Sequence, residues 1–256
     1  MMRPRIAPRP RHESPRMNLS CLLLLLTVGQ APAPPAAGES VNPGINGRFL
    51  AADLDPAEWA GRFETESREP FAARDAVVAA LGIKTGDAVA DVGAGTGTYL
   101  HPLAGAVGPA GRVYAVDLAP AFVARLRDRA AADSLNQVTP VLCSEAAVML
   151  PAESCDLVFT CDTYHHFEFP ARTLASVHAA LRPGGRLAVL DFEREEGVSS
   201  DWVLGHVRAG KATVRAEVEA AGFAFIDEPA VPGLEDNYLM IFRKPNAAET
   251  PIGELP

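Results

Sequence analysis

A glycine-rich segment, Asp91-Val92-Gly93-Ala94-Gly95-Thr96-Gly97-Thr98, has the composition of a loop that brings the backbone against a ligand. Glycines permit a tight turn and leave no side chain in the way, and a helix that follows offers free N–H groups. The spacing is G-x-G-x-G, because Thr98 stands where the dinucleotide motif G-x-G-x-x-G has its third glycine. This spacing disfavours a dinucleotide as the ligand.

A carboxylate follows at the distance that a nucleotide-type site requires. Asp117 comes twenty residues after Gly97, at the end of the apolar run Val113-Tyr114-Ala115-Val116. An acidic side chain at this position of a nucleotide-binding α/β fold accepts hydrogen bonds from ribose hydroxyls. The structural alternative is that Asp117 caps the helix expected from Pro120.

Histidines supply candidate acid–base groups. His165 and His166 stand in Cys161-Asp162-Thr163-Tyr164-His165-His166-Phe167, directly after another apolar run. A neutral imidazole accepts a proton near pH 7, so one of them is a candidate general base, while the other packs or hydrogen-bonds structurally. Glu193 and His206 are further candidates for binding a substrate, and the alternative for both is a solvated loop.

Short apolar runs alternate with amphipathic stretches, and this alternation predicts the elements that position these residues. Strand, helix, strand, repeated along the chain, predicts an α/β fold with a mostly parallel sheet covered on both faces. Two final runs with no helix between them predict a terminal hairpin with an antiparallel last strand. The predicted strands are Ala88–Val92, Arg112–Val116, Val138–Cys143, Asp156–Cys161, Arg186–Phe192, Phe223–Asp227 and Tyr238–Arg243, and the predicted helices are Gly97–Val107, Pro120–Ala132, Pro170–Leu181, Lys211–Ala221 and a stretch from Pro56 that Pro70 divides in two.

Four segments in this order, DVGAGTG, VYAVD, SCDLVFTCDTYHHF and LRPGGRLAVLDFE, resemble the class I S-adenosylmethionine-dependent methyltransferases over about residues 56–244. A closer likeness is to a poorly characterised bacterial group with an amino-terminal leader, which shares the RFE-x-ESRE, DTYHHFE and HVRAGK stretches. The resemblance implies a doubly wound, seven-stranded, Rossmann-like sheet with strand order 3-2-1-4-5-7-6. It also implies S-adenosyl-L-methionine as the cofactor.

The resemblance carries over to individual residues. The turn Gly93–Gly97 would face the methionine and ribose of the cofactor, Asp91 would position the amino group, and Asp117 would bind the ribose hydroxyls. The Gly-Asp pair that reads adenine in many members is absent, so Ser144 or Glu145 would substitute. The implied cofactor-binding residues are Asp91, Gly93, Ala94, Gly95, Thr96, Gly97, Asp117, Leu118, Ser144, Glu145 and Asp162, the catalytic candidates are His165, His166 and Tyr164, and the substrate-binding candidates are Glu193 and His206.

The expected function is methyl transfer from S-adenosylmethionine to a small molecule. One alternative is a nicotinamide-dependent oxidoreductase, which Thr98 disfavours, and another is a cofactor-binding protein without turnover. The sequence leaves the acceptor atom and the oligomeric state open. By resemblance, the helix around Arg62–Arg68 would fold over the cofactor.

The net charge and the cysteine content of the chain limit the kinds of partner and metal site that it is expected to have. The chain has 32 acidic and 23 basic side chains, and residues 39–256 alone carry a net charge of −13. Residues 39–256 are acidic enough to repel nucleic acid and anionic membrane surfaces. The charge therefore predicts no nucleic-acid partner. Cys143, Cys155 and Cys161 lack C-x-x-C spacing, so they indicate neither a disulfide framework nor a zinc site, and no metal is expected.

The first residues resemble a secretory leader. A basic start with five arginines runs into Cys21-Leu22-Leu23-Leu24-Leu25-Leu26-Thr27-Val28 and then a stretch of small residues and prolines. Residues 1–38 are therefore expected to be a signal peptide or amino-terminal membrane anchor, and the mature protein to be exported, with a cytoplasmic protein as the alternative. The remaining expected divisions are an irregular lead-in at 39–55, the methyltransferase domain at 56–245 and a flexible tail at 246–256.

Overall fold

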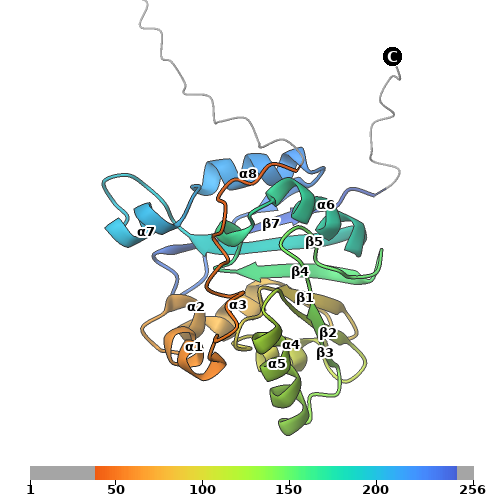
Figure 1. Cartoon of the computed structure of the whole chain (residues 1–256). Coiled ribbons are helices and arrows are strands. Elements are labelled where there is room, and N and C mark those ends of the chain that lie inside the picture. The colour runs from red at the N-terminus through yellow and green to blue at the C-terminus, as the bar shows by residue number, and fades with distance from the viewer. Residues whose placement is uncertain (1–37, 247–256) are drawn as a thin grey trace, which may run out of the picture. The chain divides into compact units, whose positions relative to one another are not determined.

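The computed structural model describes residues 38–246, and these form a seven-stranded sheet (Figure 1). The strand order is β3-β2-β1-β4-β5-β7-β6, so the predicted order is confirmed. All neighbours pair in parallel except β7, which is antiparallel to both β5 and β6. The strands are β1 (Ala88–Val92), β2 (Arg112–Asp117), β3 (Val138–Leu142), β4 (Cys155–Cys161), β5 (Leu181–Phe192), β6 (Ala224–Asp227) and β7 (Asn237–Arg243).

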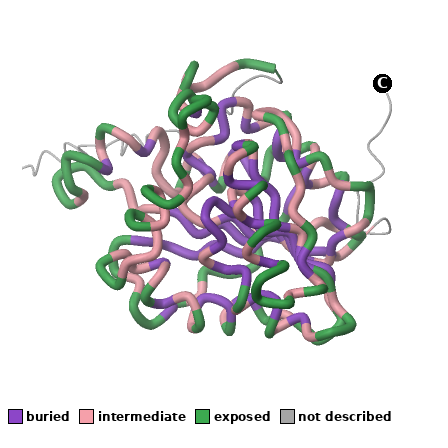
Figure 2. Tube along the Cα trace, turned by 60° about the horizontal axis from the view of Figure 1, so that its bottom comes forward, coloured by how far each residue is buried: buried purple, intermediate pink, exposed green. Residues whose placement is uncertain are grey.

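Helices cover both faces of this sheet. Alternate residues of a strand point to opposite faces, so Val89 packs into the apolar cluster beneath α3, α4 and α5, while Ala90 packs into the cluster beneath α6 and α8. The buried part of the chain runs through the middle of Figure 2, as expected for strands covered on both sides. The helices are α1 (Pro56–Phe63), α2 (Glu69–Ala72), α3 (Arg74–Ala80), α4 (Leu100–Val107), α5 (Pro120–Ala132), α6 (Pro170–Ala180), α7 (Asp201–His206) and α8 (Lys211–Ala220), with a 3₁₀ turn η1 (Tyr164–His166).

The structure corrects several predicted element boundaries. The helix predicted from Gly97 begins at Leu100, because Gly95 and Gly97 both adopt positive φ angles that no right-handed helix contains. The stretch from Pro56 gives three helices, not two. Pro70 lies in the first turn of α2, where its missing N–H costs nothing, and the chain between α1 and α2 is a turn where a helix had been expected over Arg62–Arg68.

The segment before α1 crosses the sheet without regular structure. In Figure 1 it is drawn in orange-red and runs from beside α8 down to α1. Glu168 holds it in place: the Val41 amide donates to the Glu168 carbonyl (2.9 Å), and the carboxylate accepts from Ser40 Oγ (2.8 Å) and the Gly44 amide (3.2 Å). Residues 38–55 are thus attached to the loop between β4 and α6.

No helix among residues 38–246 has the length and apolar character needed to cross a membrane. The predicted leader and most of the predicted tail lie outside the described residues.

Candidate active site

A cavity of about 610 Å³ opens at the carboxyl ends of β1, β2, β4 and β5. In open α/β sheets ligands bind at this edge, because loops from several strands meet there. Its floor is the turn after β1, and aromatic side chains of the lead-in, α1 and α5 cover it. These aromatic rings are Phe49, Trp59, Phe63 and Phe122, with neighbouring centroids 5.0 to 6.4 Å apart.

The glycine turn is required by the geometry of the floor. Gly93 has a φ of 80°, and a Cβ atom there would lie 2.3 Å from the side chain of Thr163. Gly95 has a φ of 53° and donates its N–H to Asp117 Oδ2 at 2.8 Å. Ala94 and Thr96 also line the cavity, whereas Gly97 packs against Leu100 and Leu126 outside it.

Two buried carboxylates stand beside this turn. Asp117 accepts the Gly95 and Ala119 amides, both at 2.8 Å, and burial raises its pKa to about 6. Asp91 is 2% exposed and lines the cavity, and its carboxylate has no hydrogen-bond partner among residues 38–246. Burial, and then the charge of Asp117, raises the pKa of Asp91 to about 7. This end of the cavity therefore suits a cationic or hydrogen-bond-donating ligand.

Asp162 closes the cavity on the side of β4. It has a φ of 46°, a left-handed conformation that is uncommon for a residue other than glycine. Its carboxylate pairs with Arg68 and accepts Asn237 Nδ2 at 2.8 Å. Burial raises the pKa of Asp162 to about 6, although Arg68 acts in the opposite direction.

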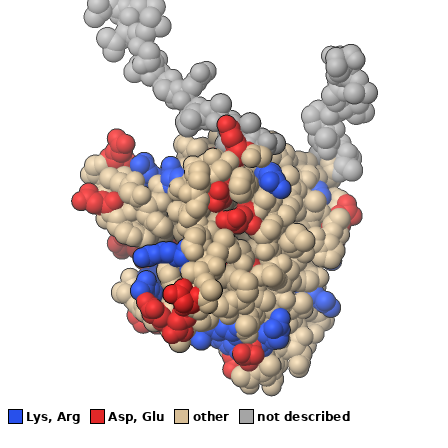
Figure 3. All heavy atoms as spheres, in the orientation of Figure 1, with Lys and Arg blue, Asp and Glu red and all other residues tan. Residues whose placement is uncertain are grey.

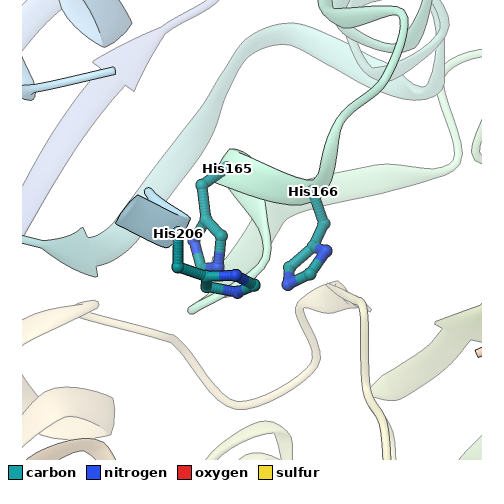
Figure 4. A group of neighbouring side chains, drawn as sticks. All are labelled: His165, His166 and His206. Atoms are coloured by element: carbon teal, nitrogen blue, oxygen red, sulfur yellow. The ribbon is translucent and has the colours of Figure 1, made fainter. Parts of the chain in front are cut away.

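Three histidines meet at the other end of the cavity, His165 and His166 from η1 and His206 from α7 (Figure 4). Asp191 on β5 accepts both the His165 amide (3.0 Å) and its Nδ1 (2.7 Å), and both side chains are almost fully buried. Burial, with His165 and His206 nearby, lowers the pKa of His166 to about 3, so this ring is neutral.

Leu118, also predicted to bind the cofactor, lines the cavity, whereas the remaining predicted site residues lie outside its lining. The Tyr164 hydroxyl donates to Glu217 Oε2 (2.8 Å) on α8, away from the cavity. Glu193 pairs with Lys211 at 2.5 Å, and Ser144 lies in an exposed turn. Glu145 approaches the lining indirectly, because its Oε1 accepts Asn46 Nδ2 at 3.4 Å.

Several lining residues were missed by reasoning from the sequence. Asn46 is buried in the lead-in, donates to the His166 carbonyl at 3.2 Å, and leaves its Oδ1 without a partner in the described part of the chain. Arg68 reaches Asp162 across 94 positions, and Trp202 stacks on His206 at 4.8 Å. Only the shared RFE-x-ESRE stretch gave a signal for Arg68; the others stand in segments without periodicity.

A family model described as "Methyltransferase domain" matches residues 90–189, which run from β1 through the histidine turn to β5. A SAM dependent methyltransferase from Aquifex aeolicus has the same fold, with a TM-score of 0.66 and 25% identity over 75% of this chain and 100% of that one. This chain carries a class I methyltransferase domain. The predicted fold class is thereby confirmed, and the cofactor of such domains is S-adenosylmethionine.

Curated relatives match the methyltransferase domain over part of their length. The ubiquinone/menaquinone biosynthesis C-methyltransferase UbiE of Cupriavidus taiwanensis is 31% identical over 120 residues, which are 46% of this chain and 48% of that protein. An uncharacterised 37.1 kDa protein in transposon TN4556 of Streptomyces fradiae is 36% identical over 110 residues, 43% of this chain and 31% of that protein. The chain thus spans half or less of the length of these relatives.

The residues present fit S-adenosylmethionine. Gly93 and Gly95 line the cavity without side chains, so the backbone of the turn lies open to a ligand. The buried Asp91 carboxylate, which has no hydrogen-bond partner in residues 38–246, suits an ammonium group. Asp117 retains lone pairs for hydroxyl donors, and the aromatic rings offer faces for a base.

Proposed function

We propose that this protein transfers the methyl group of S-adenosylmethionine to a small-molecule acceptor. The observation that carries the proposal is the buried Asp91 carboxylate, which lines the cavity beside the glycine turn with no hydrogen-bond partner in residues 38–246. A carboxylate removed from water is stabilised by a cation close to it. S-adenosylmethionine carries two cationic centres, an ammonium and a sulfonium.

Each part of the cavity has a role in this proposal. Asp91 holds the amino group, Asp117 accepts from the ribose hydroxyls, and the aromatic rings over the turn cover the base. Asn46 and Glu145 supply further polar atoms for the cofactor, since the Asn46 Oδ1 has no partner within residues 38–246. The acceptor binds beside the histidines of η1 and α7, which also line the cavity.

The bound cofactor supplies a methyl group already activated by its positive sulfur. The protein therefore has mainly to hold the acceptor in line, and such orientation supplies about 7–11 kcal/mol of a barrier. His165 has its Nδ1 fixed on Asp191, so its Nε2 is the nitrogen left to act on the acceptor. In a neutral imidazole, the ring nitrogen that carries no hydrogen accepts a proton or binds a metal ion.

A small acceptor is favoured over a nucleic acid. The cavity is partly roofed by aromatic side chains and has the volume of a small-molecule site. The net charge is −9, and on the face in Figure 3 the basic groups are interspersed with acidic ones. The similarity to UbiE, named for quinone biosynthesis, supports the same class of acceptor.

Calorimetry with purified full-length protein tests the cofactor site. S-adenosylmethionine should bind and NAD should not. Asp91→Asn keeps the shape of the side chain but removes the charge, so affinity should fall about ten- to a hundredfold, the range expected for a charge-assisted hydrogen bond. Asp75→Asn, which changes an exposed aspartate of α3, is the matched control and should leave affinity unchanged.

Two experimental outcomes would contradict the proposed methyl transfer and favour one of the alternative functions. Binding of NAD without binding of S-adenosylmethionine would make the protein a nicotinamide-dependent oxidoreductase. Tight S-adenosylmethionine binding with no S-adenosylhomocysteine formed across a broad metabolite screen would favour a cofactor-binding protein without turnover.

The proposed location is outside the cytoplasm or at the membrane, on the strength of the leader-like residues 1–38. Cell fractionation with amino-terminal sequencing tests it. An intact amino terminus in the cytosolic fraction alone would show that the leader does not act as one.

A further inference from the structure

The three histidines at the acceptor end form a compact group of nitrogens. One ring nitrogen from each of His165, His166 and His206 lies within 4.8 Å of those from the other two. The ring centroids are 4.4 Å apart for His165–His166 and 5.1 Å apart for the other two pairs. Figure 4 shows the three side chains converging from η1 and α7 on a shared space.

The ring of His165 is held by a carboxylate, in the way that is common for metal-binding histidines. A ligating histidine usually donates its second ring nitrogen to a carboxylate, which sets the tautomer and the ring orientation. Asp191 does this for His165, since it holds both Nδ1 and the backbone amide in the buried interior. The Nε2 of His165 is therefore the ring nitrogen that remains to coordinate an ion.

Neighbouring aromatic side chains pack against the rings of His166 and His206, but this packing gives the ring nitrogens no hydrogen-bond partners. Trp202 stacks on His206, and Phe49 meets His166 edge-on at 5.3 Å. Nδ1 of His166 is buried and has no hydrogen-bond partner among the residues that the structure describes. Buried polar atoms in folded proteins are nearly always paired, so an unpaired ring nitrogen in a group of three imidazoles points to a ligand.

We propose that His165, His166 and His206 bind one divalent transition-metal ion. Imidazole nitrogens suit Zn²⁺, Co²⁺ and Ni²⁺, whereas Mg²⁺ and Ca²⁺ require oxygen ligands. Three histidines also make up a known type of catalytic zinc site, in which the fourth position stays open. At metal–nitrogen distances of about 2.0–2.1 Å the nitrogens of a tetrahedral site lie roughly 3.3 Å apart, so the rings close inward when the ion binds.

Sequence spacing alone did not suggest this site. His206 stands 40 positions after His166, far outside any short metal-binding motif, and the cysteines indicated none. The fold brings α7 back over η1 and so completes a set of three ligands from two separate segments.

The three histidines line the cavity, so an open fourth position on the ion would face it and define the class of acceptor, an inference that rests on the proposed function. A small molecule with a hydroxyl or thiol would bind the ion through that oxygen or sulfur, which lowers the pKa of the donor. The proton leaves to solvent, the methyl carbon bonds to the oxygen or sulfur, and the S–CH₃ bond breaks with its electron pair left on the cofactor sulfur. The products are S-adenosylhomocysteine, the methylated acceptor and one proton.

Metal titration tests the site without using the cofactor. Full-length protein, purified without a polyhistidine tag and dialysed against chelator, is titrated with ZnCl₂ by calorimetry and with CoCl₂ by visible absorption. We expect one ion per chain and the intense visible bands of four-coordinate Co²⁺. His206→Ala should weaken binding at least tenfold, and Asp191→Asn about ten- to a hundredfold, as for other partners of metal-binding histidines.

Controls separate this site from other histidines. Two variants serve as controls: His101→Ala, which changes an exposed histidine of α4, and His178→Ala, which changes a histidine of α6 that packs against Phe223. Both should bind the two ions as the unmodified protein does. Unchanged affinity in His206→Ala would overturn the proposal. This test remains valid if Asp191→Asn fails to fold, because His206 is only half-buried. Loss of S-adenosylmethionine binding with metal binding intact would refute only the proposed function.

Discussion

Gly93 and Gly197 have the same φ of 80° but different surroundings. A Cβ atom at Gly197 would meet nothing within 4 Å, whereas at Gly93 it would lie 2.3 Å from Thr163. We expect Gly197→Ala to lower the free energy of unfolding by about 1–2 kcal/mol, the cost of the backbone conformation. Gly93→Ala should lose about 1–3 kcal/mol more from the collision, and should also weaken cofactor binding.

Urea unfolding of both variants beside the unmodified protein measures these differences. Equal losses for Gly93→Ala and Gly197→Ala would mean that Thr163 moves aside freely. The floor of the cavity would then be less constrained than the contact indicates.

The raised pKa values of Asp91 and Asp117, about 7 and about 6, predict proton release on cofactor binding. Tyr99 and Cys161 also face Asp91, and burial raises the pKa of each, so both stay neutral. A cationic ligand favours the ionised carboxylates and lowers their pKa values. Calorimetry between pH 6 and 7, in buffers of different ionisation enthalpy, should show a net release of protons.

The same groups determine how stability depends on pH. Because their pKa values are raised in the folded state, these aspartates contribute stability that is full below about pH 4 and lost as the pH rises through 6 to 7. S-adenosylmethionine should therefore raise the melting temperature more at pH 8 than at pH 5. An equal rise at both values would show that neither carboxylate contacts the cationic ligand.

Among the elements, η1 and α8 are joined by Tyr164, Glu217 and Arg208. The tyrosine hydroxyl donates to Glu217, which also forms two hydrogen bonds with Arg208. Tyr164→Phe removes a hydrogen bond to a buried charge, so the free energy of unfolding should fall by about 1.5–3 kcal/mol. Cofactor affinity should not change, because Tyr164 does not line the cavity. If Tyr164→Phe folds normally but loses tenfold in cofactor affinity, Tyr164 has a direct role in the site.

Periodicity was sufficient to predict the sheet and the helices that pack on it. Helix α5 was predicted to the residue, because Pro120 marks its start and apolar positions recur along one face. Helix α7 was not predicted, since only Val203 of its six residues is buried and so short a helix has almost no periodic signal. The misplaced start of α4 has a different cause, the positive φ of the glycines before it.

The residues of the candidate site also fall into two groups, those that local sequence predicts and those that it does not. Asp91, Asp117 and the glycine turn lie within one strand–turn–helix–strand unit, so local sequence was enough to predict them together. Asn46 and Trp202 line the cavity from segments distant from the glycine turn, and their neighbours in sequence carry no motif. Such residues can be found only from the fold.

At the scale of the whole molecule, two truncations separate the leader from the lead-in. Deleting residues 2–37 keeps every lining residue that the structure describes, so we expect cofactor affinity to stay within about twofold of the full chain. Deleting residues 2–55 also removes Asn46 and Phe49. Because aromatic stacking on a base contributes about 1–3 kcal/mol, this deletion should weaken binding on the order of tenfold or more and lower the melting temperature.

A matched pair of point variants localises the effect. Phe49→Ala removes a ring that contacts Trp59, Phe122 and His166, and should reproduce much of the loss. Leu50→Ala changes its exposed neighbour and should have no effect. If both variants bind the cofactor equally well, the lead-in does not contribute to the site.

The attachment of the lead-in to Glu168 also bears on the order in which the chain folds. The bonds from Ser40, Gly44 and Asn46 to residues 166–168 join positions 120 to 128 apart, whereas β1 and β2 pair across only 24. Contacts between distant positions form late, because a long loop must close first. The Val41 amide should accordingly exchange with deuterium sooner than the Val92 amide in β1. A newly made chain would thus assemble its sheet first and gain its binding cavity in the final step.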